Sequence, residues 1–296
     1  MPNRLLLVDG HSYAYRAFHA IRSLNAPDGS PTNAIFGFIK MLQKMVGALK
    51  PSHVLVLWDA GLAAERSAAL PEYKAHRPPT PEALEQQFPQ IETWLEAAGF
   101  PQFQEQGTEA DDWIGTYARR AEAAGWTVVI ASSDKDFLQL VNDRVGILNP
   151  NDKSEKIWSA ADVEAKTGIS PGQVADWLAL VGDAVDNIPG VRGVGPKTAA
   201  ELLRKFGSIE GLYGRLNEIR SESQRTALAG AADAVKRNQL MVRLHDSKTG
   251  GPDLTSLTPG EPNLPILRGL YARWGFKSLL SEVGGSPIEP VQGSLL

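Results

Sequence analysis

Short uninterrupted runs of apolar residues alternate with longer amphipathic stretches over the first half of the chain. Apolar runs of this length, without alternating polar residues, are typical of strands buried on both faces. We predict strands at residues 4–8, 53–58 and 127–131. The amphipathic stretches predict helices at residues 33–49, 81–98 and 109–124. Strands and helices that alternate in this way predict a parallel sheet with helices on both faces.

Glycines mark two of the predicted helix ends, and the pattern changes after residue 159. Gly99 and Gly125 stand where the C-terminus of a helix favours a left-handed residue. From Ser159 onward, Gly and Pro separate short stretches, which indicates a part built from short helices. The sequence therefore predicts an α/β domain over residues 1–160, a helical domain over 161–285 with a helix at 265–274, and a loose tail at 286–296.

An aspartate follows each of the predicted strands. Asp9, Asp59 and Asp134 come at the ends of the first, second and third apolar runs. In open parallel sheets, ligands bind outside the carboxyl ends of the strands. A single aspartate after a strand usually caps the next helix, but the repetition favours a shared ligand site at this edge.

Further acidic residues cluster in short motifs. Glu109, Asp111 and Asp112 open a predicted helix, where compensation of the helix dipole explains two carboxylates more easily than three. Asp183 and Asp186 follow an apolar helix, and its C-terminus disfavours acids, so a ligand role gains weight. With Asp136, the candidate carboxylates are Asp9, Asp59, Glu109, Asp111, Asp112, Asp134, Asp136, Asp183 and Asp186.

So many carboxylates in one cleft would repel one another and raise each other's pKa unless cations bind. Hard oxygen ligands in a chain without Cys favour Mg²⁺ or Mn²⁺ over zinc, and the five His show no paired ligand spacing. Two divalent ions about 4 Å apart are a standard way to hydrolyse phosphodiesters without a Ser, Cys or His nucleophile.

Residues 188–198, IPGVRGVGPKT, form a glycine-rich turn between predicted helices. Gly190, Gly193 and Gly195 permit close approach of backbone N–H groups to a phosphate, and Lys197 and Thr198 open a helix whose N-terminus favours an anion. This pattern predicts a helix-hairpin-helix that grips a nucleic-acid backbone without reading its sequence. A P-loop is disfavoured because Pro196 stands where the Lys is needed, and a ligand-free turn remains the alternative.

A second basic patch lies in the long connection after Asp59. Tyr73 beside Lys74 and Arg77 offers a stacking face with phosphate partners. Arg66 stands earlier in the same connection, and Arg16 on the helix after Asp9 could join them. Ordinary surface charge on a loop is the alternative, although long loops in compact domains are often functional.

Charge is distributed unevenly along the 296 residues. The net charge of −4 suggests no polyanionic partner, but residues 101–186 hold 15 acidic and 7 basic residues, whereas residues 187–245 hold 5 and 10. Metal ions would balance the acidic part, and duplex DNA would bind the basic part. The absence of Cys excludes disulfides and thiol nucleophiles. Because no stretch resembles a signal peptide or a membrane span, we expect a cytoplasmic protein without a membrane partner.

Several motifs in a fixed order resemble one family. They are VDG at 8–10, WDA at 58–60, EYKAHRPPTP at 72–81, EADD at 109–112, SSDKDF at 132–137 and GDAVDNIPGVRGVGPKTA at 182–199. The chain resembles the 5′-nuclease (flap endonuclease) family over residues 3–280. It is most similar to the 5′–3′ exonuclease domain at the N-terminus of bacterial DNA polymerase I. Whether the chain is free-standing or a fragment of a polymerase stays open.

The resemblance implies a fold and an activity. The fold would be a PIN-like three-layer α/β/α domain with a parallel central sheet, followed by a small all-α domain containing a helix-hairpin-helix. The activity would be Mg²⁺-dependent hydrolysis of DNA near a 5′ flap or 5′ end, in replication and repair. Two Mg²⁺, for which Mn²⁺ would substitute, would be held by the nine carboxylates above.

The resemblance also implies roles for individual residues. The residues expected in catalysis are Lys74, Arg77, Asp111 and Asp134, with Lys74 and Arg77 in an arch segment at about 61–80. K⁺ would bind the backbone of the hairpin at Leu180, Val181, Pro189, Val191 and Val194. DNA would contact Arg16, Arg66, Tyr73, Lys74, Arg77, Arg192, Gly193, Gly195, Lys197 and Thr198. The arch departs from the family pattern because Glu65, not an aromatic residue, precedes Arg66.

We further expect a monomer, associated with the bacterial nucleoid, with a DNA polymerase as a candidate partner. Two other functions stay open at this point. A non-catalytic binder of DNA junctions would keep the fold without turnover. A PIN-like ribonuclease would act equally on single-stranded RNA, which the duplex-tracking hairpin argues against.

Overall fold

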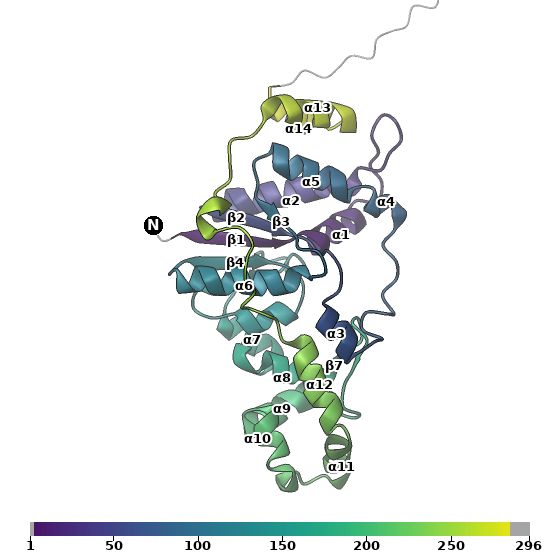
Figure 1. Cartoon of the computed structure of the whole chain (residues 1–296), viewed down its shortest axis with the longest axis vertical. Helices are drawn as coiled ribbons and strands as arrows, with labels where there is room; N and C mark the ends of the chain where they lie inside the picture. Colours follow the sequence, from purple (N-terminus) through teal and green to yellow (C-terminus); the bar gives the residue numbers. More distant parts are fainter. Residues whose placement is uncertain (1–2, 285–296) are drawn as a thin grey trace, which may run out of the picture. The chain divides into compact units, whose positions relative to one another are not determined.

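The computed structural model describes residues 3–284, and its main sheet is mostly parallel (Figure 1). Its strands are β1 (Arg4–Asp9), β2 (His53–Leu57), β3 (Gln102–Phe103), β4 (Thr127–Ala131), β5 (Val145–Leu148) and β6 (Ile157–Trp158). They follow the order β3-β2-β1-β4-β5-β6. β1, β4 and β5 pair in parallel, and β6 closes the edge antiparallel to β5. The strands predicted at 4–8, 53–58 and 127–131 are therefore confirmed to within a residue.

The apolar composition of these strands is explained by their burial. Leu5 to Val8 on β1 have no exposed surface, and Leu6 lies in register with Val129 of β4. Helix α6 (Ala110–Ala123) packs against β1 and β4. Burial on both faces removes the alternation of polar and apolar residues that a half-exposed strand would show.

The chain forms two compact units. The first contains residues 3–9, 57–79 and 103–254, and the second contains residues 10–56, 80–102 and 255–284. The domain boundaries predicted at residues 160 and 285 stay predictions. The tail predicted at 286–296 lies outside the described residues.

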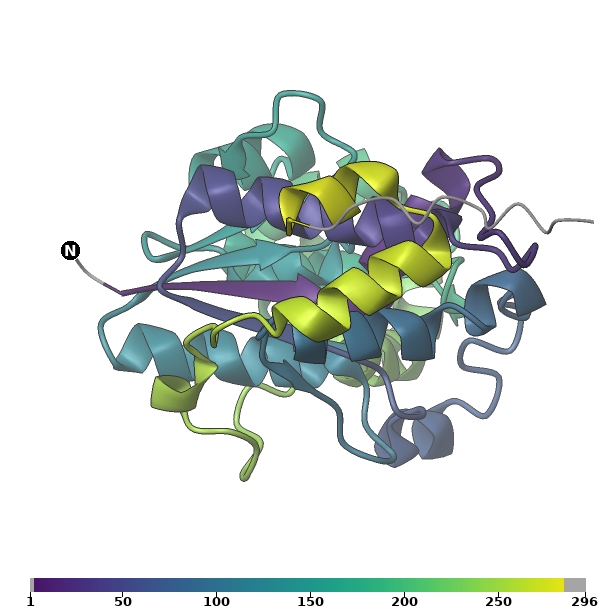
Figure 2. The same cartoon turned by 90° about the horizontal axis from the view of Figure 1, so that it is seen from above.

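Helices dominate the second unit, where α13 crosses α5 in Figure 2. They are α1 (Gly10–Ala20), α2 (Asn33–Leu49), α4 (Glu82–Glu85), α5 (Phe88–Ala97), α13 (Leu264–Trp274) and α14 (Lys277–Glu282). The predicted helices at 33–49 and 265–274 are confirmed. Trp94 of α5 donates its indole N–H to the hydroxyl of Tyr271 on α13 at 2.8 Å, which satisfies a buried donor.

The single helix predicted at 81–98 is wrong, because α4 and α5 are separate. Gln87 lies at the break, is 1% exposed, and its Oε1 accepts hydrogen bonds from Ala34 N at 2.8 Å and Ile35 N at 3.2 Å. It thereby satisfies free N–H groups at the start of α2. Pro89 in the first turn of α5 has no N–H to bond back toward α4. Gln87, which caps α2, and Pro89 therefore interrupt the single helix that the sequence pattern predicted.

Short helices make up most of the rest of the first unit. They are α3 (Ala64–Ala69), α7 (Ala160–Thr167), α8 (Val174–Val181), α9 (Pro196–Phe206), α10 (Ile209–Tyr213), α11 (Glu222–Gly230) and α12 (Ala232–Val242). Single 3₁₀ turns occur at η1 (Asp136–Leu140), η2 (Pro171–Gln173) and η3 (Leu216–Glu218), and η4 (Leu254–Leu257) ends this stretch. Gly125 after α6 has φ 80°, which confirms its predicted left-handed conformation.

Helices α8 and α9 flank a small hairpin, as the helix-hairpin-helix prediction requires. We call residues 182–195 the hairpin; its strands β7 (Gly182–Asp183) and β8 (Ile188–Pro189) pair antiparallel. A Cβ on Gly190 would lie 2.0 Å from the carbonyl oxygen of Val181, so only glycine allows this approach. Within residues 3–284, no helix combines the length and apolar character needed to cross a membrane.

Candidate active site

Carboxylates from five segments of the first unit form what we call the acidic cluster. Its members are Asp9, Asp59, Asp111, Asp134, Asp136, Asp183 and Asp186. Asp9 ends β1, and Asp134 follows β4, the strand that pairs with β1. The ends of the paired strands β1 and β4 therefore bring Asp9 and Asp134 to the same edge of the sheet, as expected.

Three members of the cluster have raised pKa values. Burial and the nearby charges of Asp134, Asp9 and Asp59 raise the pKa of Asp111 well above its ordinary value. Burial and the charges of Asp134, Asp183 and Asp186 do the same to the pKa of Asp136. Burial, with Asp186 and Asp183, also raises the pKa of Asp134. The protein thus holds carboxylates where protons or cations are needed to compensate them.

Local hydrogen bonds fix several of these side chains. Asp59 Oδ1 accepts from Ala110 N at 2.7 Å and so holds the start of α6. Ser132 Oγ donates to Asp9 Oδ2 at 2.9 Å, and Asp136 N donates to Asp134 Oδ1 at 2.8 Å. Asp136 Oδ1 is buried and has no hydrogen-bond partner. An orphaned buried carboxylate oxygen is unusual and is suited to bind a cation.

Glu109 and Asp112 belong to a second, internally compensated network. Arg66 of α3 donates to Glu109 and, at 2.7 Å, to Asp112, and these three residues are 4%, 1% and 2% exposed. Lys74 also donates to Glu109. Burial raises the pKa of Glu109, but the charges of Lys74 and Arg66 outweigh it and lower the pKa. Glu109 is therefore held ionised by protein cations.

The segment that carries Lys74 and Arg77 is fixed against the hairpin. Lys74 has φ 57°, a strained conformation for a residue with a side chain, and its N–H donates to the carbonyl of Asp186 at 3.0 Å. Arg77 Nε donates to Asp186 Oδ1 at 3.1 Å, and Asn187 Nδ2 donates to the carbonyl of Glu72 at 2.9 Å. These contacts place both basic side chains at the border of the acidic cluster.

The residues present fit divalent cations, although their side chains do not converge in a coordination geometry. Over residues 3–284, no group of three or more His, Cys, Asp or Glu side chains converges as a metal site. Lys135 and Arg77 form ion pairs with Asp183 and Asp186. The donors are hard oxygens, which suit Mg²⁺ or Mn²⁺. Asp111, Asp134 and Asp136 would hold them, with the other members of the cluster beside them.

Some residues expected at DNA lie elsewhere. Arg66 is buried and also donates to the carbonyls of Met241 at 3.1 Å and Arg243 at 3.3 Å, so it does not reach the surface that a DNA contact needs. Tyr73 is 7% exposed, and its hydroxyl faces Glu109 at 3.4 Å instead of offering a stacking face. Arg16 lies on α1 in the second unit, and its DNA contact stays a prediction.

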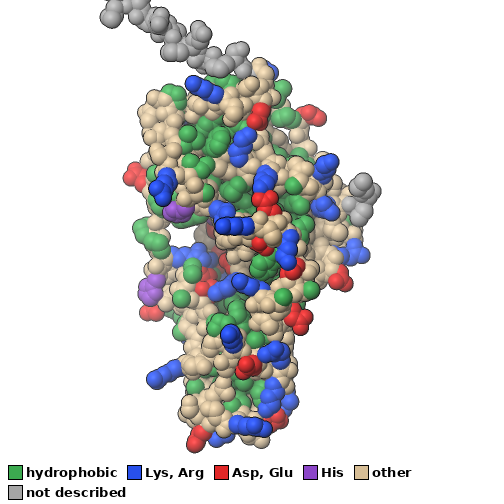
Figure 3. All heavy atoms as spheres, turned by 180° about the vertical axis from the view of Figure 1, so that it is seen from behind, with side chains coloured by type: hydrophobic (Ala, Val, Ile, Leu, Met, Phe, Trp, Pro, Cys, Tyr) green, Lys and Arg blue, Asp and Glu red, His purple; other side chains and the backbone are tan. Residues whose placement is uncertain are grey.

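The hairpin and the first turn of α9 carry the other residues expected to contact DNA. Arg192, Gly193, Gly195 and Lys197 are exposed, and Thr198 is half-buried in the first turn of α9. Lys and Arg side chains, with acidic ones between them, stand over the part of the surface formed by α9–α11 in Figure 3. A phosphate would meet backbone N–H groups and Lys197 here.

The carbonyls expected to bind K⁺ lie around the same hairpin. Those of Leu180, Pro189 and Val191 accept hydrogen bonds from Val191 N, Asn238 Nδ2 and Val194 N. A carbonyl oxygen has two lone pairs, so a carbonyl that accepts a hydrogen bond can also bind a cation. Val181 and Val194 complete the predicted set, which stays a prediction.

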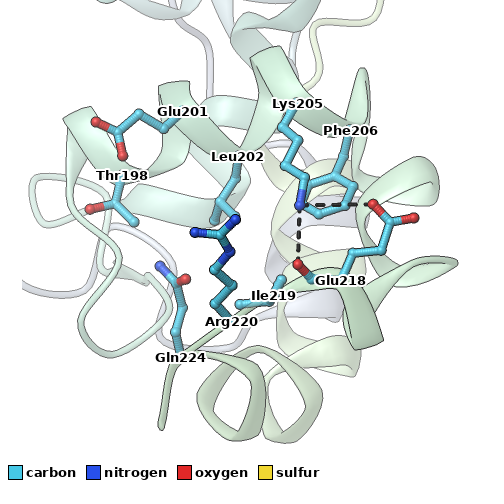
Figure 4. A pocket seen from close by; sticks show the side chains of 9 residues that line it. All are labelled: Thr198, Glu201, Leu202, Lys205, Phe206, Glu218, Ile219, Arg220 and Gln224. Atoms are coloured by element: carbon cyan, nitrogen blue, oxygen red, sulfur yellow. Dashed lines mark hydrogen bonds and ion pairs between the residues drawn. The ribbon is translucent and has the colours of Figure 1, made fainter. Parts of the chain in front are cut away.

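A pocket of about 400 Å³ lies away from the acidic cluster, between α9, η3 and α11 (Figure 4). Arg220 projects into it, and Lys205 bonds the carbonyl of Glu218 across it at 3.1 Å. Leu202, Phe206 and Ile219 are buried beneath it. Its two carboxylates, Glu201 and Glu218, lie on opposite sides of it, and Lys205 pairs with Glu218, so the acidic cluster remains the candidate active site.

Family models match this chain in two consecutive parts. Residues 4–168 match the N-terminal resolvase-like domain of 5′-3′ exonucleases, and residues 169–264 match their C-terminal SAM fold. The chain belongs to the 5′-3′ exonuclease family. The predicted α/β fold with a following helical part is thereby confirmed, as is an enzyme of the DNA-hydrolysing nuclease type.

Individual members of the 5′-3′ exonuclease family agree over nearly the whole chain. A 5′-3′ exonuclease of Aquifex aeolicus is 36% identical, and the match covers 94% of both chains. DNA polymerase I of Thermus thermophilus is 38% identical over 95% of this chain, which spans 33% of that protein's length.

Solved structures agree in fold. The bacteriophage T5 protein co-crystallised with metal ions is 21% identical, with a TM-score of 0.69 over 95% of this chain and 98% of that chain. The catalytic core of Rad2 in complex with DNA substrate is 16% identical, with a TM-score of 0.63 over 95% and 92%. At these identities the likeness shows the fold alone.

Proposed function

We propose that the protein is a Mg²⁺-dependent, structure-specific 5′ nuclease that hydrolyses DNA near a 5′ flap or 5′ end. The observation that carries this proposal is the cluster of Asp111, Asp134 and Asp136, whose pKa values are raised by burial and mutual repulsion. Such a site suits two divalent cations, which would act as Lewis acids on the scissile phosphodiester. Family membership and the metal ions and DNA named with its fold relatives support it.

Protein side chains have separate tasks in this proposal. The acidic cluster holds the cations. Lys74 and Arg77, fixed at its border by Glu109 and Asp186, contact the phosphate and stabilise the charge that develops on it. The hairpin grips the duplex through its backbone, aided by K⁺ on the carbonyls of residues 180–194. Sequence-independent binding suits a nuclease that recognises a DNA structure.

The biological setting is also proposed. Replication and repair, in the bacterial cytoplasm at the nucleoid, fit an enzyme that removes 5′ ends. The DNA polymerase I relatives support a polymerase as partner. A monomer is also part of the proposal.

Cleavage of a labelled 5′-flap duplex tests the proposal. We expect cleavage with Mg²⁺ or Mn²⁺, none with EDTA, and none for Asp134→Asn. Asp152→Asn is the matched control. Asp152 lies in the loop before β6, outside the acidic cluster, and accepts a hydrogen bond from the indole N–H of Trp158. Absence of cleavage with either metal would overturn the enzyme proposal. Flap binding without turnover, with binding unchanged in Asp134→Asn, would favour a non-catalytic binder of DNA junctions. Cleavage of single-stranded RNA as fast as that of flap DNA would favour a ribonuclease.

A further inference from the structure

One buried amide fastens the hairpin to helix α12. Asn238 lies on α12 and has no exposed surface. Its Nδ2 donates to the carbonyl of Pro189 at 2.7 Å and to that of Ala179 at 3.1 Å. Pro189 belongs to β8 and Ala179 to α8, so this side chain ties the hairpin and the first helix of the helix-hairpin-helix to a third helix. Both donors of the amide are thereby used.

The Pro189 carbonyl is an effective point at which to hold this loop. Proline has no N–H, so the carbonyl is its only backbone hydrogen-bonding group. The next residue, Gly190, packs against the carbonyl of Val181, and Val191 N donates to the carbonyl of Leu180 at 2.9 Å. The orientation of the Pro189 peptide therefore sets the path that the chain follows from Pro189 to Lys197 at the start of α9.

Gln239, the residue after Asn238 on α12, contacts a different part of the same unit. Gln239 Nε2 donates to Asp176 Oδ1 at 2.6 Å, and Asp176 Oδ2 accepts from Ile209 N at 2.9 Å. That chain of bonds leads to the start of α10 and not to the hairpin. Two consecutive amide side chains thus fix different parts of the same unit.

We propose that Asn238 is a positioning residue for DNA binding. It does not touch DNA, because it is buried, but it sets the direction in which residues 190–195 present their backbone N–H groups. This inference rests on the proposed function of the hairpin. Its consequence is specific: loss of the amide lowers affinity for duplex more than it slows the chemical step, because the amide bonds backbone carbonyls of Pro189 and Ala179 and not a carboxylate of the acidic cluster.

Three measurements on the full chain test this role. Asn238→Ala removes the amide, and Asn238→Asp keeps its shape but replaces the donor by an acceptor. Gln239→Ala is the matched control. We compare amide hydrogen exchange of the DNA-free proteins, the Kd for a 5′-flap duplex without divalent metal, and the cleavage rate at saturating enzyme.

For Asn238→Ala and Asn238→Asp we expect exchange of the Val191 and Val194 amides to be faster by about tenfold or more. The Kd should rise by about tenfold, while the saturating cleavage rate stays within about twofold. Gln239→Ala should speed exchange at Ile209 and leave the Kd unchanged. If Asn238→Ala does not fold, Asn238→Thr, which keeps one donor, should show an intermediate effect.

Unchanged exchange in the hairpin of Asn238→Ala would overturn the proposal. So would an unchanged Kd despite faster exchange, or an equal rise in Kd for Gln239→Ala. The hydrogen-exchange result does not depend on any activity. A wild-type protein that neither binds nor cleaves flap DNA would therefore refute the proposed function separately.

Discussion

Lys74 donates a charge-assisted hydrogen bond to Glu109, a carboxylate that is 1% exposed. Burial lowers the pKa of Lys74, but the charge of Glu109 outweighs it, so the pKa is raised and the ammonium stays charged. Asp111 contributes to the same effect, which places Lys74 beside the acidic cluster. The backbone of Lys74 is held by the carbonyl of Asp186. Lys74 is thus oriented before substrate arrives.

Lys74→Met should therefore slow the chemical step more than it weakens binding. We expect the single-turnover cleavage rate at saturating enzyme to fall by about 10²–10³-fold, because a fixed cation facing the developing charge is lost. The Kd for flap DNA should change by less than about threefold. Lys50→Met is the control: Lys50 shares the left-handed conformation (φ 45°) at the end of α2. A loss confined to affinity would remove Lys74 from the active site.

Arg66→Met should destabilise the protein. The substitution leaves Glu109 and Asp112 buried with one cation fewer, and it frees the carbonyls of Met241 and Arg243. Breaking a buried ionic group in this way costs about 3–5 kcal/mol. Urea unfolding measures the loss. Arg119→Met is the control, because its pairs with Glu122 and Asp246 are half-exposed and contribute no more than about 1 kcal/mol. Equal stability of Arg66→Met and wild type would contradict a structural role.

The sequence predicted those features that depend on local pattern. The β1 and β4 strands and helices α2 and α6 follow from continuous apolar runs and helical spacing. Strand ends correctly indicated that Asp9 and Asp134 approach, because parallel strands share one edge. The short strands β3, β5 and β6 were missed, since two to four residues carry too little pattern.

Long-range pairing explains what the sequence could not predict. Arg66 bonds Glu109 across 43 positions and Met241 across 175, and no local spacing indicates such partners. Gln87 is similar, because its role as a cap for α2 depends on a residue 53 positions away. For Asn238, the sequence showed only a polar residue on an apolar helix face, which does not indicate its partners in the hairpin.

Asp136→Asn should stabilise the metal-free protein. A carboxyl whose pKa is raised on folding binds protons better in the folded state, so stability falls as pH rises from its ordinary value of 3.8 through the raised pKa. Removing the charge should therefore add about 0.5–2 kcal/mol at pH 7 in EDTA, measured by urea unfolding. The difference should shrink as the pH approaches 4. A difference independent of pH would contradict the electrostatic cause.

Asp162 supplies a control of opposite sign. Hydrogen bonds from Lys156 and Ser159 lower the pKa of Asp162 to about 2. A carboxyl with a lowered pKa stabilises the folded state above its ordinary pKa, and this contribution is lost as the pH falls toward the lowered value. Asp162→Asn should therefore destabilise the protein at pH 7, and the loss should diminish in acid. Both substitutions convert Asp to Asn, so only the surroundings distinguish them.

Mg²⁺ should raise the melting temperature of the protein. A ligand that binds only the folded state stabilises it by about 2.7 kcal/mol at a hundredfold excess over its Kd. Differential scanning calorimetry with MgCl₂ or MnCl₂ against EDTA measures the shift. Asp134→Asn should remove most of it, while Asp152→Asn should retain it. A shift that persists in Asp134→Asn would show that the cations bind elsewhere.

Lys197→Ala should weaken duplex binding through one phosphate contact. Lys197 is exposed in the first turn of α9, where the hairpin ends. Each phosphate that a protein neutralises releases counterions, so log K falls with log salt by about 0.9 per contact on duplex DNA. Removing Lys197 should reduce that slope by about 1 and leave the saturating cleavage rate unchanged. Lys166→Ala, an exposed lysine in the last turn of α7, is the control. An unchanged slope in Lys197→Ala, measured by titration at several KCl concentrations, would mean that duplex DNA does not approach this end of the hairpin.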